Sequence, residues 1–116
     1  LNGDKFTTCC LQRAIHYLPY DKALNLLKNL RKIVTGRLYI SVTGIDSAIG
    51  DNYQDKEKIV QERFCRLSSD AAGTFNIHEP LCLYVKIEFE ELMNNSGWEV
   101  EESWVSAFGN IKVICT

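Results

Sequence analysis

The chain has 116 residues, of which 13 are basic and 15 acidic, and its formal net charge is −2. This length suits one domain, and a hydrophobic content of 46% is ordinary for a soluble globular protein. A balanced charge argues against a nucleic-acid interface, which needs a clustered basic surface. No apolar run approaches the roughly 20 residues that span a bilayer, and no basic-then-apolar leader is present, so we expect a cytoplasmic protein.

The cysteines do not form a metal or disulfide pattern. Their number is odd and no CxxC occurs, and two of them are adjacent, so that in a strand their side chains would point to opposite faces. Small buried thiols in a reducing cytosol are the favoured interpretation, with a zinc site or a disulfide framework as the alternatives. No histidines have the i, i+4 spacing of metal ligands, so we expect no metal. The five cysteines are Cys9, Cys10, Cys65, Cys82 and Cys115.

The first third of the chain predicts a strand, a helix and a second strand. Gly3-Asp4 is a turn signal, and the β-branched and apolar run Phe6–Leu11 predicts the first strand. After Pro19, apolar residues recur at steps of three and four, which predicts a helix capped by Asp21. Gly36 is expected to end this helix in a left-handed conformation. Leu38–Val42 then predicts a strand covered on both faces, as in a parallel α/β sheet.

The middle of the chain is a long excursion with weaker patterns. Residues 43–55 predict a loop, and Asp55 is expected to cap a helix that runs to about Leu67. Residues 68–80 predict another loop, and Pro80–Tyr84 is extended.

The last third predicts a helix and a hairpin. The helix runs from about Lys86 to Asn95, and Ser96-Gly97 ends it. Strands at 99–105 and 111–115 flank a four-residue turn, so we expect them to pair antiparallel. Trp98 and Trp104 are expected to be packing residues.

This order of elements resembles the C-terminal half of a class I, Rossmann-like S-adenosylmethionine-dependent methyltransferase. FTTCCLQRAIHYLP resembles the family's fourth strand and the turn after it. The segment from Asp21 to Val42, which ends IVTGRLYISV, resembles the fourth helix and fifth strand, with Thr35-Gly36-Arg37 in place of the usual Pro-Gly-Gly. YVKIEFEELMNNSGWEVEESWVSAFGNIKVICT resembles the last helix and the terminal hairpin.

The resemblance implies an α/β fold in which residues 1–116 form a single domain that is half of a methyltransferase domain. The family's sheet order is 3-2-1-4-5-7-6, so this chain would hold strands 4-5-7-6, with the last strand pair antiparallel and the helices mainly on one face. The GxGxG-like cofactor turn and the acidic residue for the ribose hydroxyls have no counterpart here, and would lie upstream of Leu1. We therefore expect S-adenosylmethionine to be the cofactor of a longer parent, and this chain by itself to bind it weakly or not at all and to be inactive.

A half-domain would also leave the first strand as an unpaired edge and one sheet face without helices. Because an open apolar edge or face favours association, we expect a homodimer or the docking of a separate N-terminal half.

The candidate site residues follow the first strand. Leu11, Gln12 and Arg13 lie at its carboxyl end, where ligands of open α/β sheets bind, and the resemblance places them near the cofactor's methionine end. An ordinary loop is the alternative. The resemblance also places His16 and His78 near the substrate. Packing or a structural hydrogen bond is the alternative for His16, and surface exposure is the alternative for His78. No general base stands out, and the methyl acceptor is not encoded in a recognisable pattern.

Two other functions are compatible with the same sequence. The first is a non-catalytic α/β interaction module that associates with itself through its open edge. The second is a small flavodoxin-like nucleotide-binding domain, which the absence of a phosphate-binding loop after any predicted strand disfavours.

Overall fold

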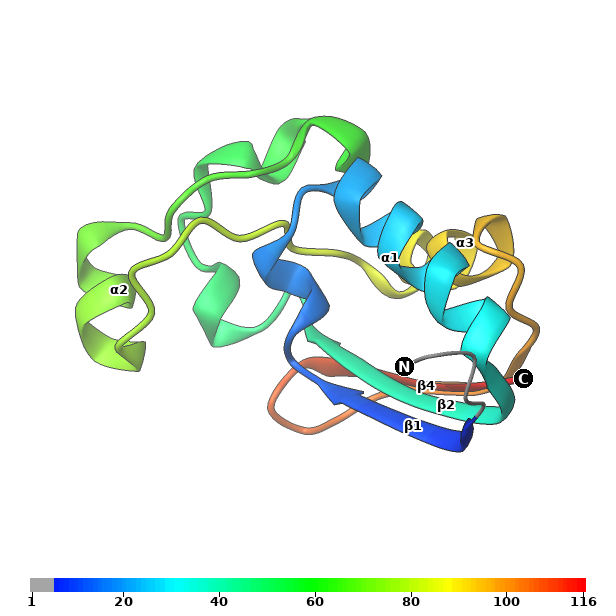
Figure 1. The fold of residues 1–116 in the computed structure, drawn as a ribbon. Coiled ribbons are helices and arrows are strands. Elements are labelled where there is room, and N and C mark those ends of the chain that lie inside the picture. The colour runs from blue at the N-terminus through cyan, green and yellow to red at the C-terminus, as the bar shows by residue number, and fades with distance from the viewer. Residues whose placement is uncertain (1–5) are drawn as a thin grey trace.

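The computed structural model describes residues 6–116 and contains one four-stranded mixed sheet with the order β1-β2-β4-β3 (Figure 1). β1 and β2 are parallel, whereas β4 is antiparallel to both of its neighbours. The predicted strand order and the antiparallel final pair are therefore confirmed, while the predicted turn at Gly3-Asp4 lies outside the described residues. The strands are β1 (Phe6–Gln12), β2 (Val34–Thr43), β3 (Val100–Val105) and β4 (Asn110–Cys115).

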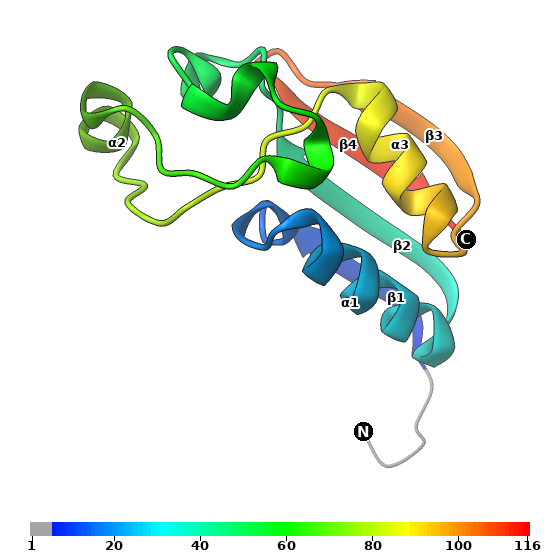
Figure 2. The same cartoon turned by 90° about the horizontal axis from the view of Figure 1, so that it is seen from above.

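Two helices cover one face of this sheet. Figure 2 shows α1 (Tyr20–Ile33) over β1 and β2, and α3 (Lys86–Asn95) over β4 and β3. The apolar stripe of α1 places Ala23 and Leu27 fully in the core, as its periodicity predicts. Trp98 is buried in the core, and its indole Nε1–H donates to the carbonyl oxygen of Leu27 in α1 at 3.0 Å. None of the described helices is long and apolar enough to cross a membrane.

β2 alternates between the two faces of the sheet. Leu38, Ile40 and Val42 are buried against the helices, whereas Arg37 and Tyr39 lie on the opposite face, which no helix of the described chain covers (Figure 1). The prediction of a strand covered on both faces therefore fails at Tyr39, although Ser41 on the same face is buried. Both helices lie in connections between strands, and both connections pass over the same side of the sheet. This one-sided cover is the arrangement that the sequence predicted.

The ends of α1 differ from the prediction. Its N-cap is Pro19, and Asp21 lies inside the first turn, where its charge favours the positive end of the helix dipole without capping it. At the other end the chain passes from Ile33 directly into β2, so Gly36 does not stop the helix. Gly36 lies within β2 beside a register shift, and a Cβ there would be 2.0 Å from the Thr7 carbonyl oxygen.

The excursion between β2 and α3 is also organised differently from the prediction. The helix expected from Asp55 to Leu67 is replaced by two short 3₁₀ turns, because side chains take up the backbone groups that a helix would use. Asp55 Oδ2 accepts the Phe64 N–H at 2.8 Å, and Arg63 Nε donates to the Lys58 carbonyl oxygen at 2.8 Å.

A short helix, α2 (Ser69–Phe75), instead occupies the stretch predicted to be a loop. The Ser68 hydroxyl caps it by accepting the Ala71 N–H at 3.3 Å, and Asn76 ends it in a left-handed conformation. In Figure 1 this helix lies beyond the carboxyl ends of β1 and β2. A second, smaller core beneath the excursion contains Ile45, Ile49, Tyr53, Leu67, Ala71, Leu81 and Leu83.

Candidate functional site

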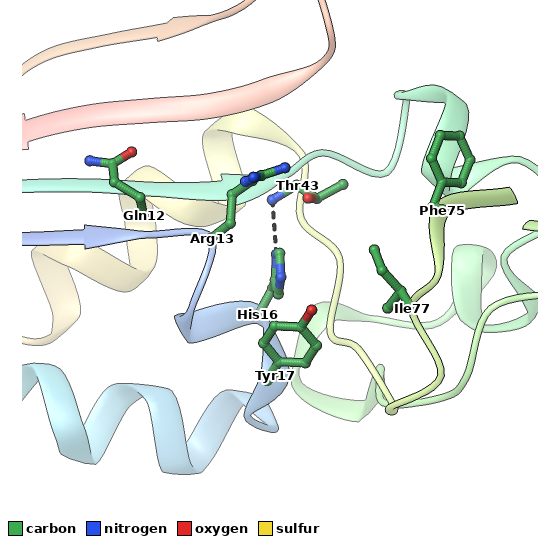
Figure 3. A pocket seen from close by; sticks show the side chains of 7 residues that line it. All are labelled: Gln12, Arg13, His16, Tyr17, Thr43, Phe75 and Ile77. Carbon is green, nitrogen blue, oxygen red and sulfur yellow. Dashed lines mark hydrogen bonds between the residues drawn. The ribbon is translucent and has the colours of Figure 1, made fainter. Parts of the chain in front are cut away.

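A pocket of about 270 Å³ opens at the carboxyl ends of the parallel strands β1 and β2 (Figure 3). Parallel strands end at the same edge of a sheet, and this edge is the usual position of ligands in open α/β folds. One side of the pocket comes from the connection between β1 and α1, and the other comes from α2 and the residues that follow it. The lining residues are Gln12, Arg13, His16, Tyr17, Thr43, Phe75 and Ile77.

Arg13 turns the chain out of β1 in a conformation that is uncommon for a residue with a side chain. Its φ is +52°, and its N–H donates to the Ser41 carbonyl oxygen at 2.9 Å and lies 3.2 Å from Ser41 Oγ. Ser41 Oγ in turn donates to Gln12 Oε1 at 2.7 Å. A left-handed non-glycine residue costs on the order of 1 kcal/mol, so these bonds hold a strained turn in place.

His16 is buried under the pocket, with a 2% exposed fraction. Its Nδ1 accepts the Thr43 N–H at 3.1 Å (Figure 3), and therefore the neutral ring carries its proton on Nε2. Burial, together with the nearby positive charge of Arg13, lowers the His16 pKa to about 4, so the ring is neutral at physiological pH. The His16 carbonyl oxygen also accepts the Cys82 N–H at 2.8 Å, which ties this turn to the extended segment before α3.

Both sides of the pocket contribute aromatic or apolar side chains. Tyr17 is 40% exposed, and its ring meets the His16 ring edge-on at a centroid distance of 4.6 Å. Phe75 lies opposite, together with Ile77 (Figure 3), and packs edge-on against Phe108 of the β3–β4 turn at 6.4 Å. The hairpin turn thus supports the wall that α2 presents to the pocket.

The structure brings together three of the five predicted site residues. Gln12, Arg13 and His16 line the pocket, whereas Leu11 is half-buried and packs against the core below α1. His78 is exposed and outside the lining, with its Nε2 3.2 Å from Asn76 Oδ1.

Sequence reasoning did not assign four of the lining residues to the site. Thr43 was within reach of the same reasoning that found Gln12, because it ends the neighbouring parallel strand. Tyr17 stands beside His16 in the turn after β1. No sequence signal marks Phe75 and Ile77, which reach the pocket only through the fold of the excursion. Within residues 6–116, no group of three or more His, Cys, Asp or Glu side chains could hold a metal ion.

Solved structures of methyltransferases share this fold. The 1,6-didemethyltoxoflavin-N1-methyltransferase of Burkholderia thailandensis matches 99% of the chain with a TM-score of 0.65 and 15% identity. Magnesium protoporphyrin IX methyltransferase from Synechocystis PCC 6803 matches 97% with a TM-score of 0.62 and 10% identity. The mitomycin 7-O-methyltransferase MmcR matches 97% with a TM-score of 0.61 and 17% identity.

The chain spans 45%, 45% and 30% of those three structures, respectively, which is less than half of each. No family model and no curated protein sequence matches it. The chain therefore shares its α/β fold with a part of these methyltransferase structures.

Proposed function

We propose that this chain is the C-terminal portion of an S-adenosylmethionine-dependent methyltransferase, and that by itself it is inactive. The supporting observation is the strand order β1-β2-β4-β3 with a parallel first pair and a reversed last strand, which aligns over nearly the whole chain with part of several methyltransferases. The cofactor would supply a methyl group on a sulfonium for transfer to an acceptor, and such enzymes act chiefly by alignment and desolvation.

The residues of this chain do not fit the whole cofactor. In Rossmann folds an acidic side chain binds the ribose hydroxyls and a glycine-rich turn approaches the nucleotide. The seven residues that line the described pocket include neither a carboxylate nor a glycine. What they offer is a cation, Arg13, beside the neutral ring of His16. They are suited to the rim of a cofactor site and to an acceptor, which agrees with weak or absent cofactor binding by residues 1–116.

The test starts from the coding sequence upstream of Leu1. We expect it to encode a strand followed by a GxGxG-like turn, and about 20 residues later an acidic strand end. The longer polypeptide should bind S-adenosylmethionine at micromolar concentration in calorimetry, and residues 1–116 should not. Micromolar binding by residues 1–116 contradicts the inactive-fragment part of the proposal. A longer polypeptide that lacks both the turn and cofactor binding contradicts the enzyme assignment.

The partner proposed for this chain is the missing N-terminal half, docked on the free side of β1. In the described chain β1 pairs only with β2, and a groove of about 410 Å³ runs beside it. This edge groove contains Phe6, Thr8, Cys9, Cys10, Leu30, Ile33 and Val34.

The same edge groove supports the second candidate function, a non-catalytic module that forms a homodimer through β1. Its mainly apolar lining is the specific observation in its favour. Sedimentation in the presence of the N-terminal half separates the candidates. An interaction module should keep its self-association when that half is supplied, whereas a half-domain should lose it.

We also propose a cytoplasmic location. All five cysteines are free, including the exposed Cys10, which is typical of a reducing compartment. Thiol titration of protein isolated without reductant should find five reactive groups after denaturation; fewer would contradict this location.

A further inference from the structure

The pocket at the carboxyl ends of β1 and β2 carries an unbalanced positive charge. Arg13 is its only permanently charged residue, and none of its seven lining residues, all in the described chain, is acidic. Two other arginines are paired, Arg37 with Glu101 at 3.0 Å and Arg63 with Glu88 at 2.5 Å. No described carboxylate forms an ion pair with Arg13. The left-handed turn at Arg13 places this residue in the lining of the pocket. A guanidinium without a carboxylate partner in a pocket favours the binding of an anion.

The neighbouring polar groups of the pocket are also donors. His16 uses Nδ1 as an acceptor for the Thr43 N–H and therefore retains a donor at Nε2. Gln12 uses Oε1 to accept from Ser41, which leaves its NH₂ group available. The local electrostatics thus favour a ligand that accepts hydrogen bonds and carries negative charge.

The pocket also contains a smaller apolar area against which a flat ring can lie. Tyr17, Phe75 and Ile77 present two aromatic rings and a branched side chain (Figure 3). A volume of about 270 Å³ is at the small end for ligand sites, so it accommodates a ligand with one ring.

We propose that this pocket binds a single-ring aromatic carboxylate, whose carboxylate is held by the Arg13 guanidinium and whose ring lies against Tyr17 and Phe75. Guanidinium and carboxylate match in a planar, two-bonded geometry that a lysine does not reproduce. That this ligand is the methyl acceptor rests on the proposed function; its binding to the pocket does not.

The binding test uses residues 1–116 and three probes, followed by ¹⁵N–¹H amide spectra. Sodium benzoate should shift the amides of residues 12–17 and 75–77 and bind at least 10-fold more tightly than benzamide, which lacks the charge, or acetate, which lacks the ring. The factor is that expected for one charge-assisted hydrogen-bonded contact. Equal binding of benzoate and benzamide, or benzoate shifts confined to other residues, would overturn the proposal.

Substitutions identify the group responsible. Arg13→Gln should weaken benzoate binding by about 10-fold or more, and Arg13→Lys should weaken it as well, because the planar fork is lost. Arg66→Gln is the matched control, since Arg66 is exposed and outside the lining, and it should leave binding unchanged. If Arg13→Gln does not give a folded spectrum, Arg13→Gly replaces it, because glycine tolerates the positive φ. Unchanged binding in the folded variant contradicts the role of Arg13.

The outcome is separable from that of the proposed function. Benzoate binding requires no cofactor, so it can succeed when the longer polypeptide fails to bind S-adenosylmethionine. Conversely, the longer polypeptide can transfer methyl groups while benzoate fails to bind the pocket. That result would support the enzyme assignment and exclude an aromatic carboxylate as the ligand.

Discussion

His16 illustrates how one residue serves both the fold and the pocket. Its ring links the turn after β1 to the end of β2 through the Thr43 N–H, and the same ring lines the pocket beside Arg13. The bond to Thr43 requires an unprotonated Nδ1, so protonation would break a buried hydrogen bond as well as bury a charge.

A pH dependence of stability follows from this arrangement. The folded-state pKa of about 4 lies below the unfolded value near 6.5, so the unfolded chain binds the proton first. The contribution of His16 is therefore complete above pH 6.5 and is lost as the pH falls toward 4, with a limit of about 3 kcal/mol. Urea unfolding of the wild type between pH 7.5 and 4.5 should show this loss. His16→Gln, which keeps an acceptor for Thr43 but does not titrate, should show a smaller slope. Parallel slopes would contradict the prediction.

The sequence predicts the position of a residue where a strand dictates it, while the proposed roles of these residues stay predictions. Gln12, Arg13 and His16 could be found because they follow a strand whose end borders the ligand edge of a parallel sheet. Trp98 was predicted to pack and does so, but Trp104 is 43% exposed, because its side of β3 faces the sheet surface that no described helix covers. A local pattern marks an apolar residue without telling whether a partner covers its face.

At the scale of elements, predictions held for segments whose pattern was regular. The helix Lys86–Asn95 and the terminal hairpin were predicted almost to the residue, because periodicity and turn residues agreed there. The excursion was not predictable in the same way. Its shape depends on side chain to backbone bonds between distant residues, such as that of Arg63 with Leu83, which no local window contains.

An ion pair between the buried Arg63 and the half-buried Glu88 links the excursion to α3. Arg63 Nη2 and Glu88 Oε2 are 2.9 Å apart, and Glu88 Oε1 also accepts the Val85 N–H at 2.9 Å at the start of the helix. Glu88→Ala should destabilise the fold by about 3 kcal/mol, because it leaves Arg63 buried without its partner and removes a cap. The double variant Arg63→Leu/Glu88→Leu should lose less free energy of unfolding than the sum of the losses in the single variants Arg63→Leu and Glu88→Leu. Urea unfolding checks both, and an additive result would contradict the coupling.

Gly36 and Gly73 form a matched pair of glycine substitutions. Gly36→Ala should destabilise the β1–β2 pairing by about 2 kcal/mol or more, because the new Cβ meets the Thr7 carbonyl oxygen at 2.0 Å. Gly73→Ala, in α2 with nothing within 4 Å, should stabilise by about 0.5–1 kcal/mol through helix propensity. Thermal unfolding compares the two. A similar effect of both substitutions would contradict the close approach at Gly36.

At the scale of the whole molecule, the sheet is one-sided and open at β1. The face that the helices cover is apolar and buried, whereas the residues of β1 are mostly exposed. The opposite face is mixed, because it carries the ion pair of Arg37 with Glu101 as well as the aromatic side chains of Tyr39 and Trp104. The sequence predicted association through an open apolar edge or face, and the edge groove has a mainly apolar lining. We therefore expect association through the edge of β1, where the edge groove lies.

Without an N-terminal half, residues 1–116 should associate weakly, with sedimentation coefficients that rise with concentration, because β1 offers unpaired backbone groups beside apolar side chains. Cys10→Lys places a charge on this exposed edge and should shift the population to monomer. Ala107→Lys, at the exposed β3–β4 turn, adds the same charge elsewhere and should leave association unchanged. Equal loss in both variants would indicate a net-charge effect, and persistence of the dimer in Cys10→Lys would move the interface away from β1.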